Sequence, residues 1–209
     1  MSKLWIKICG ITRNSDAIAA VASGADAIGL VFYAASPRAV SKDRVEEITD
    51  GIVGKAQVVA LFVDAQEEEV NKVLETNRID LLQFHGSESA QYCESFGLPY
   101  MKAFRVNADN YREQNFASYD SAQMILLDSY SELNPGGTGK VFDWRIGRKI
   151  KVMTEMNIVV AGGLSPDNVK AAIEQIHPFG IDVSSGVEQD YGIKDLTKVS
   201  AFIEGARSV

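Results

Sequence analysis

Short apolar runs and amphipathic segments alternate along the whole chain. The runs are rich in β-branched residues and begin about every 25 residues, a spacing that accommodates one strand, one helix and two short loops. The predicted strands are residues 4–9, 27–32, 57–62, 80–84, 100–105, 124–127, 158–161 and 180–183. Between them, helix-start signals precede apolar-periodic stretches, for example at residues 14–16, 41–43 and 165–167. The pattern predicts eight parallel strand–helix units.

Eight such units can form a closed (β/α)8 TIM barrel or an open doubly wound sheet, and the count of eight favours the barrel. No Pro, Gly or Ser-rich linker divides the 209 residues, so we expect a single α/β barrel domain over residues 1–209. The predicted helices include residues 17–22, 45–53 and 169–176. The fifth, residues 107–116, has the weakest helical pattern because it is polar almost throughout.

Charge and cysteine content limit the partners and the compartment. With 28 acidic against 21 basic residues, the net charge of -7 argues against nucleic acid or anionic membranes as general partners. The longest apolar runs, such as residues 56–63, which Gln57 interrupts, are far shorter than the roughly 20 residues that span a bilayer. Lys7 interrupts the apolar N-terminal patch, so a signal peptide is not expected. The two cysteines, Cys9 and Cys93, favour a reducing cytoplasm over a disulfide framework.

In a TIM barrel the catalytic groups lie at the carboxyl ends of the strands. Cys9 ends the first predicted strand, with Lys7 two residues earlier on the same face. Its thiolate could serve as a base or nucleophile, although a free cysteine is also a common small buried residue. Asp128 ends the sixth strand and could be a general acid or a turn residue. Asp182, on the eighth strand, competes for the same role, and the sequence does not rank the two.

Two clusters of small residues follow the last two predicted strands. Gly162 and Gly163 come after the seventh strand, and Ser184, Ser185 and Gly186 come after the eighth. The loops at these positions commonly hold a phosphate in TIM barrels, and backbone amides bind the anion without a basic side chain. Either cluster alone could be ordinary turn chemistry. The two together predict a phosphorylated small-molecule ligand, which an acidic protein can hold in this way.

Further polar residues follow other strands. A third cluster, residues 135–140, includes Gly137 and could be a flap over the site, since it lacks the spacing of an NTP-binding loop. Arg38 could bind a carboxylate in bidentate fashion or be a solvated loop residue. His85 could be an acid–base residue. With only two histidines and no clustered ligands, no metal site is expected.

Seven motifs lie in order, each at a predicted strand end. They are residues 7–12 (KICGIT), 36–38 (SPR), 83–86 (QFHG), 127–129 (LDS), 136–139 (GGTG) with 142–144 (FDW), 161–164 (AGGL) and 182–188 (DVSSGVE). Together they resemble the phosphoribosylanthranilate isomerase family of tryptophan biosynthesis, over almost the whole chain. Two departures are Phe84, where the family usually has Leu, and residues 189–192, which replace a commoner proline-containing turn.

The resemblance implies an Amadori rearrangement without a cofactor. The substrate would be N-(5-phosphoribosyl)anthranilate and the product 1-(2-carboxyphenylamino)-1-deoxyribulose 5-phosphate. By this resemblance Asp128 is the acid and Cys9 the base, and Arg38 orients the anthranilate carboxylate. Our own inference from the residues is that Lys7 keeps Cys9 ionised.

The same resemblance assigns the remaining site residues. We expect His85, Gly137 and Asp182 to bind substrate. The phosphate is expected at the backbone amides of Gly162, Gly163, Ser184, Ser185 and Gly186. The oligomeric state is left open between monomer and homodimer.

Two other functions are compatible with parts of this pattern. A histidine-pathway isomerase performs the same chemistry on a substrate with two phosphates, but that family resembles a two-Asp system with half-barrel repeats, whereas Cys9 ends the first strand here and no repeat is visible. A catalytically silent, ligand-binding barrel would be favoured by loss of Cys9 or Asp128, and both are present.

Overall fold

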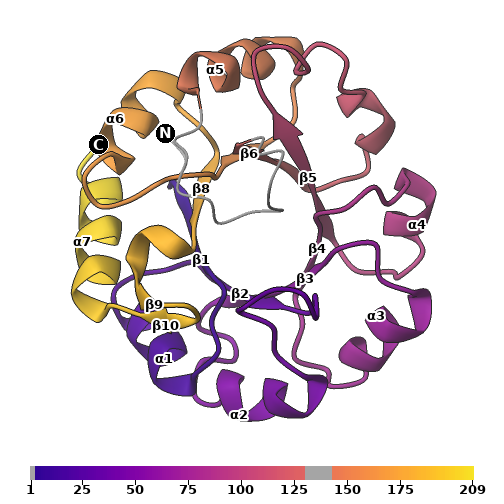
Figure 1. The fold of residues 1–209 in the computed structure, drawn as a ribbon, viewed down its shortest axis with the longest axis vertical. Helices are drawn as coiled ribbons and strands as arrows, with labels where there is room; N and C mark the ends of the chain where they lie inside the picture. Colours follow the sequence, from indigo (N-terminus) through magenta and orange to yellow (C-terminus); the bar gives the residue numbers. More distant parts are fainter. Residues whose placement is uncertain (1–2, 130–142) are drawn as a thin grey trace.

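Eight parallel strands form a closed barrel in the computed structural model, which describes residues 3–129 and 143–209. Neighbouring strands follow the chain order, and β8 returns to pair with β1. The helices surround the ring of strands (Figure 1). The predicted TIM barrel is therefore confirmed.

The strands match the predicted runs to within two residues at each end. They are β1 (Trp5–Cys9), β2 (Ala27–Val31), β3 (Gln57–Phe62), β4 (Leu81–Phe84), β5 (Tyr100–Val106), β6 (Met124–Ser129), β7 (Ile158–Val160) and β8 (Gly180–Val183). The helices are α1 (Asn14–Ala22), α2 (Val45–Thr49), α3 (Glu67–Leu74), α4 (Ala90–Glu94), α5 (Trp144–Met153), α6 (Val169–Ile176) and α7 (Leu196–Arg207). Short 3-10 turns, η1 (Lys42–Arg44), η2 (Phe116–Tyr119) and η3 (Ser185–Val187), and a small hairpin, β9 (Glu188–Asp190) with β10 (Ile193–Lys194), complete the described elements.

The fifth predicted helix, residues 107–116, is wrong. Turns and η2 connect β5 to β6 instead. The side-chain oxygen of Asn107 accepts hydrogen bonds from the amides of Asp109 and Asn110, both at 2.9 Å. Such local side-chain bonds compete with helical backbone bonds, and the polar segment offers little apolar surface to reward a helix. The helix predicted over residues 45–53 also ends earlier, at Thr49.

Alternate residues of each strand point into the barrel, as the two-residue period of a strand requires. The interior is apolar near the strand starts, where Trp5, Leu81 and Met101 pack together with their neighbours. Toward the carboxyl ends the same inward positions carry polar side chains, including Lys7, Gln83, Asp128 and Asp182, all of them buried. The barrel therefore has an apolar floor and a polar mouth.

The outer layer is apolar where the strands face the helices. Buried aliphatic and aromatic side chains form separate clusters between the barrel and the surrounding helices. No helix within residues 3–129 and 143–209 combines the length and the apolar character that a bilayer crossing requires. Both cysteines are free and buried.

Candidate active site

Cys9 ends β1 at the mouth of the barrel and is 5% exposed. Lys7 lies one inward position deeper, is 0% exposed, and donates a 2.9 Å hydrogen bond from Nζ to Oδ1 of Asp182 on β8. Burial raises the pKa of the Cys9 thiol above its ordinary value; Lys7 opposes this effect and Asp182 adds to it. In the free protein burial therefore opposes the thiolate that Lys7 favours, and the expectation that Lys7 keeps Cys9 ionised stays a prediction. Lys7 is held by a carboxylate, and burial dominates at the thiol.

Gly29 on β2 makes room for this pair. It is the register partner of Cys9 across the β1–β2 ladder. A Cβ atom at Gly29 would lie 2.8 Å from Cys9 Sγ and 2.9 Å from Lys7 Cε. Those separations are below van der Waals contact, so only glycine leaves the sulfur and the lysine stem where they are.

Asp128 is the last residue but one of β6 and is 7% exposed, with its side chain directed into the mouth. Its Oδ1 accepts a 2.8 Å hydrogen bond from the amide of Ser129, and its Oδ2 lies 3.3 Å from Nε2 of His85. Gly162 packs directly on this carboxyl group, because a Cβ there would meet Asp128 Oδ1 at 2.7 Å. The structure thus brings together Asp128, His85 and the first phosphate-loop glycine.

Two residues that sequence reasoning missed support His85. Gln83 on β4 lies with its Nε2 3.0 Å from His85 Nδ1, and Arg105 on β5 donates from Nη2 to the His85 carbonyl at 3.2 Å. Both occupy inward positions of their strands, at even spacing from Leu81 and Met101. The signal that could have found them is this strand period, which places polar residues on the barrel-facing side.

Arg38 is 7% exposed, so the alternative of a solvated loop arginine is wrong. Its Nε and Nη2 bind both carboxylate oxygens of Glu188 at 2.8 and 2.6 Å, and its guanidinium lies 5.3 Å from the centre of the Tyr191 ring. The Nε–Nη2 edge of the guanidinium is thus occupied by an internal carboxylate. Nη1 has no hydrogen-bond partner within residues 3–129 and 143–209.

Glu188 is the centre of a small ionic network. Lys194 Nζ also donates to its Oε1, at 2.8 Å. Burial opposes ionisation of this carboxyl group, but Arg38 and Lys194 together hold the pKa of Glu188 below its ordinary value. The Arg38 stem crosses Gly10, where a Cβ would lie 2.6 Å from Arg38 Cδ and 2.9 Å from Ser184 Oγ. This network therefore fixes Arg38 beside the β1 and β8 strand ends.

The two predicted phosphate loops lie against each other. A Cβ at Gly186 would overlap the carbonyl oxygen of Leu164, so the loop after β8 touches the loop after β7 through this glycine. Gly162 and Gly163 have φ angles of +81° and +69°, which favour glycine. Among the described residues, no acceptor is found for the amides of these two glycines. Unpaired amides in a turn of this kind can hold an anion.

The other polar residues after the last strand are placed close by. Ser184 follows β8 and Ser185 begins the short turn η3. Gly137, which we expected to contact substrate, lies outside the described residues. No group of three or more His, Cys, Asp or Glu side chains within residues 3–129 and 143–209 is arranged to hold a metal ion.

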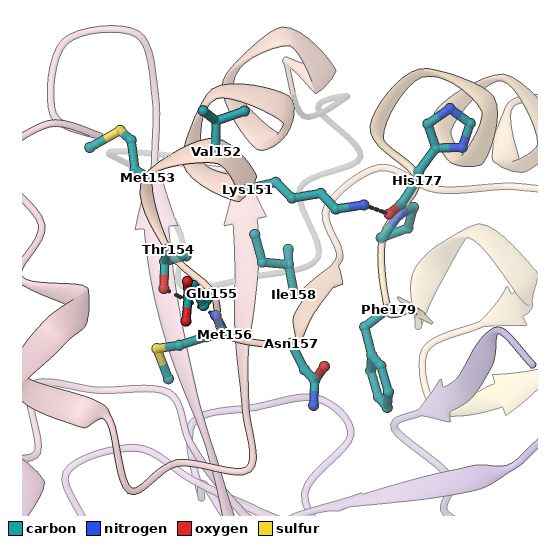
Figure 2. A pocket seen from close by; sticks show the side chains of 11 residues that line it. Lys151, Val152, Met153, Thr154, Glu155, Met156, Asn157, Ile158, His177 and Phe179 are labelled. Atoms are coloured by element: carbon teal, nitrogen blue, oxygen red, sulfur yellow. Dashed lines mark hydrogen bonds between the residues drawn. The ribbon is translucent and has the colours of Figure 1, made fainter. Parts of the chain in front are cut away.

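A separate cavity of about 690 Å³ lies at the opposite end of the barrel, where β7 and β8 begin (Figure 2). Residues 151–158 and 177–179 line it, and Lys151 reaches across to donate to the carbonyl of His177 (Figure 2). None of the predicted site residues lines this cavity. The chemistry is therefore to be sought at the mouth, not here.

Known proteins resemble this chain over almost its whole length. The family model described as N-(5'phosphoribosyl)anthranilate (PRA) isomerase matches residues 6–205. The chain belongs to this isomerase family. An N-(5'-phosphoribosyl)anthranilate isomerase of Pseudomonas aeruginosa (strain LESB58) is 50% identical over 100% of this chain and 97% of its own length.

Solved structures of the isomerase family have the same fold. The crystal structure of phosphoribosyl anthranilate isomerase from Thermotoga maritima superposes with a TM-score of 0.90, at 34% identity, covering 99% of this chain and 100% of that one. A second structure, with a TM-score of 0.87, 32% identity and coverage of 99% and 100%, is of the isomerase in complex with reduced 1-(o-carboxyphenylamino)-1-deoxyribulose 5-phosphate. The family and the isomerase class predicted from the motifs are confirmed.

Both oligomeric forms occur among relatives in the isomerase family. A further structure is of monomers generated from the dimeric Thermotoga maritima enzyme, with a TM-score of 0.85, 33% identity and coverage of 99% and 100%. These neighbours are consistent with either state expected for this chain, monomer or homodimer.

Proposed function

We propose that the chain converts N-(5-phosphoribosyl)anthranilate into 1-(2-carboxyphenylamino)-1-deoxyribulose 5-phosphate, with Asp128 as general acid and Cys9 as general base. The observation that carries the proposal is the placement of these two side chains. Cys9 is the last residue of β1 and Asp128 the last but one of β6. These strands are separated in the ring by β7 and β8, and both residues lie at the same mouth of the closed barrel. Membership in the isomerase family supplies the reaction.

One acid and one base suffice for this chemistry. Protonated Asp128 gives its proton to the ring oxygen of the ribose, and the bond from C1 to that oxygen breaks to leave a Schiff base. The Cys9 thiolate then takes the proton from C2, which produces an enolamine. The enolamine tautomerises to the ketone without a cofactor.

The base requires a thiolate, and the raised pKa of Cys9 makes the thiol the resting form. Lys7 and Lys194 are the charges that favour the thiolate. Lys7 is tied to Asp182, so its ammonium stays fixed beneath the sulfur while the proton moves. On this view Asp182 acts by holding Lys7, and its role toward substrate is indirect.

The charged ends of the substrate fit the rest of the mouth. Glu188 takes only the Nε–Nη2 edge of Arg38, so the edge formed by Nη1 and the second N–H of Nη2 is the one that we assign to the anthranilate carboxylate. The amides of Gly162 and Gly163, with those of Ser184, Ser185 and Gly186, are assigned to the phosphate. Two observations support this assignment: the described residues offer no acceptor to the amides of Gly162 and Gly163, and the two loops touch. Two free buried cysteines support a reducing cytoplasm as the compartment.

The test follows the fluorescence of the anthranilate ring as substrate is consumed. Wild type is compared with Cys9→Ala and Asp128→Asn. Cys93→Ala is the matched control, because Cys93 is also free and buried but belongs to α4, which packs on the outside of the barrel. Loss of a positioned acid or base lowers kcat by roughly 10²- to 10⁴-fold. We expect both site variants to fall in that range and Cys93→Ala to stay near wild type.

Circular dichroism confirms that each variant is folded. Wild type that binds phosphate-bearing ligands but leaves the substrate unchanged would overturn the reaction. A folded Cys9→Ala variant with near wild-type kcat would overturn the assignment of the base.

A further inference from the structure

Gln83 is a wholly buried amide in the barrel interior, 0% exposed, and the acid–base mechanism does not use it. Its Nε2 lies 3.0 Å from Nδ1 of His85. Its Oε1 is also buried and has no hydrogen-bond partner in the described part of the chain. Among the described residues, the contact with His85 is the one hydrogen bond that the Gln83 side chain makes, so it is the interaction that orients this amide.

The orientation decides where His85 carries its proton. An amide nitrogen has only hydrogens to donate, so His85 Nδ1 must accept. A neutral imidazole with an accepting Nδ1 carries its proton on Nε2. Nε2 is the ring nitrogen that faces Asp128: it lies 3.3 Å from Oδ2 of that carboxyl group and, among the described residues, makes no hydrogen bond in the geometry shown.

The backbone of His85 is fixed from two sides, which leaves the ring little freedom to drift. Its amide donates to the carbonyl of Phe62 on β3 at 2.9 Å, and its carbonyl accepts from Arg105 Nη2 at 3.2 Å. The tautomer then determines what the ring presents to Asp128.

We propose that Gln83 is a positioning residue of the isomerase: its amide holds His85 in the Nε2–H tautomer, so that His85 offers a hydrogen-bond donor to the carboxylate of Asp128. This inference rests on the proposed role of Asp128 as the acid. The donor stabilises Asp128 in the ionised state in which it is left after protonating the ring oxygen.

The first test measures the tautomer in the ligand-free enzyme by ¹⁵N NMR of the imidazole nitrogens. The chain has only two histidines, and His177→Asn assigns the second one; asparagine suits its left-handed backbone, φ 50°. At a pH about 1.5 units above the reference histidine value of about 6.5, we expect wild-type His85 to be protonated on Nε2 alone. A proton on Nδ1 in wild type overturns the proposal.

Variants at position 83 make the same measurement diagnostic. Gln83→Met keeps the length of the side chain and removes both hydrogen-bonding ends, so we expect a mixture of tautomers. Gln83→Glu supplies only acceptors, so we expect Nδ1 to become protonated. A Gln83→Met spectrum identical to wild type would show that another group sets the tautomer and would overturn the proposal.

The kinetic readout separates positioning from substrate binding. Gln83→Met should lower kcat by about 10- to 100-fold, less than removal of the acid itself, and leave KM nearly unchanged. Gln57→Met is the matched control, because Gln57 begins β3 at the far end of the barrel and bonds to Trp5. Equal losses in the two variants would indicate a general packing defect and overturn the proposal.

The NMR measurement and the turnover assay test two different claims. The NMR result is independent of turnover, so an inactive wild type with His85 protonated on Nε2 would refute the proposed function and leave the tautomer assignment intact. Wild-type turnover with His85 protonated on Nδ1 would do the reverse.

Discussion

Replacing Lys7 by methionine leaves Asp182 as an unpaired buried carboxylate in the middle of the barrel. The ammonium and carboxylate are 2.9 Å apart, and the two side chains are 0% and 9% exposed. At an effective dielectric constant of about 20, two unit charges at that distance attract by about 6 kcal/mol, most of which offsets their loss of hydration. Breaking a buried pair from one side typically costs about 3–5 kcal/mol, and we expect Lys7→Met to lose that much free energy of unfolding.

The double variant Lys7→Met, Asp182→Asn is the internal control. It contains no buried charge at this place, so we expect it to be more stable than Lys7→Met alone, with about half of the loss recovered. The assay is urea unfolding near neutral pH, followed by circular dichroism and by tryptophan fluorescence to check that the two transitions coincide. A single variant within about 1 kcal/mol of wild type, or a double variant whose loss equals the sum of the two single losses, would refute the reasoning.

Three further outcomes follow from other contacts. Gly29→Ala puts a Cβ 2.8 Å from Cys9 Sγ, which must retreat by about 0.6 Å to reach the 3.4 Å of an ordinary contact; we expect kcat/KM to fall by roughly 10- to 100-fold, and unchanged kinetics in a folded variant would show that the sulfur position is not critical. Burial opposes ionisation of Glu188, but Arg38 and Lys194 lower its pKa in the folded protein below the ordinary value. The ion pairs of Glu188 therefore contribute fully to stability above the unfolded-state pKa of about 4.3, and that contribution is lost as the pH falls through the lower pKa of the folded state. The stability difference between wild type and Glu188→Gln should therefore shrink in acid, and urea titrations that give a pH-independent difference would contradict it. Burial raises the pKa of Cys93 to about 12, so in a Cys9→Ala background a thiol reagent at pH about 8 should react with Cys93 only after unfolding; labelling of the native protein at the rate of a free thiol would argue against this burial.

Most of the fold could be predicted from local sequence patterns. The strands were predictable because a barrel strand is a short, β-branched run whose length and spacing are set by its own residues. The helix predicted over residues 107–116 failed because Asn107 and Asn110 satisfy backbone groups locally, which periodicity does not register. Where side-chain hydrogen bonds replace helical ones, composition describes polarity but not conformation.

The site was predictable only in part. Cys9 and Asp128 stand at strand ends, and the position rule of the barrel finds them. The pairing of Arg38 with Glu188, 150 residues later, and of Lys7 with Asp182 depends on strand register and loop path across the closed ring, which no local window contains. The sequence assigns no role to Gln83, although it stands in the motif of residues 83–86. Its role depends on the contact with His85 and on the position of His85 beside Asp128, which only the structure shows.

The contact between Lys7 on β1 and Asp182 on β8 joins the first barrel strand to be synthesised to the last one. Lys7 and Asp182 are separated by 175 residues, so the first strand emerges from the ribosome with a lysine whose counter-charge is translated near the end of the chain. Until β8 is made, burying β1 would strand an ammonium in an apolar interior, and the nascent chain gains nothing by closing early. The ion pair therefore makes a closed barrel that lacks β8 costly in free energy, because Lys7 would be buried without its counter-charge.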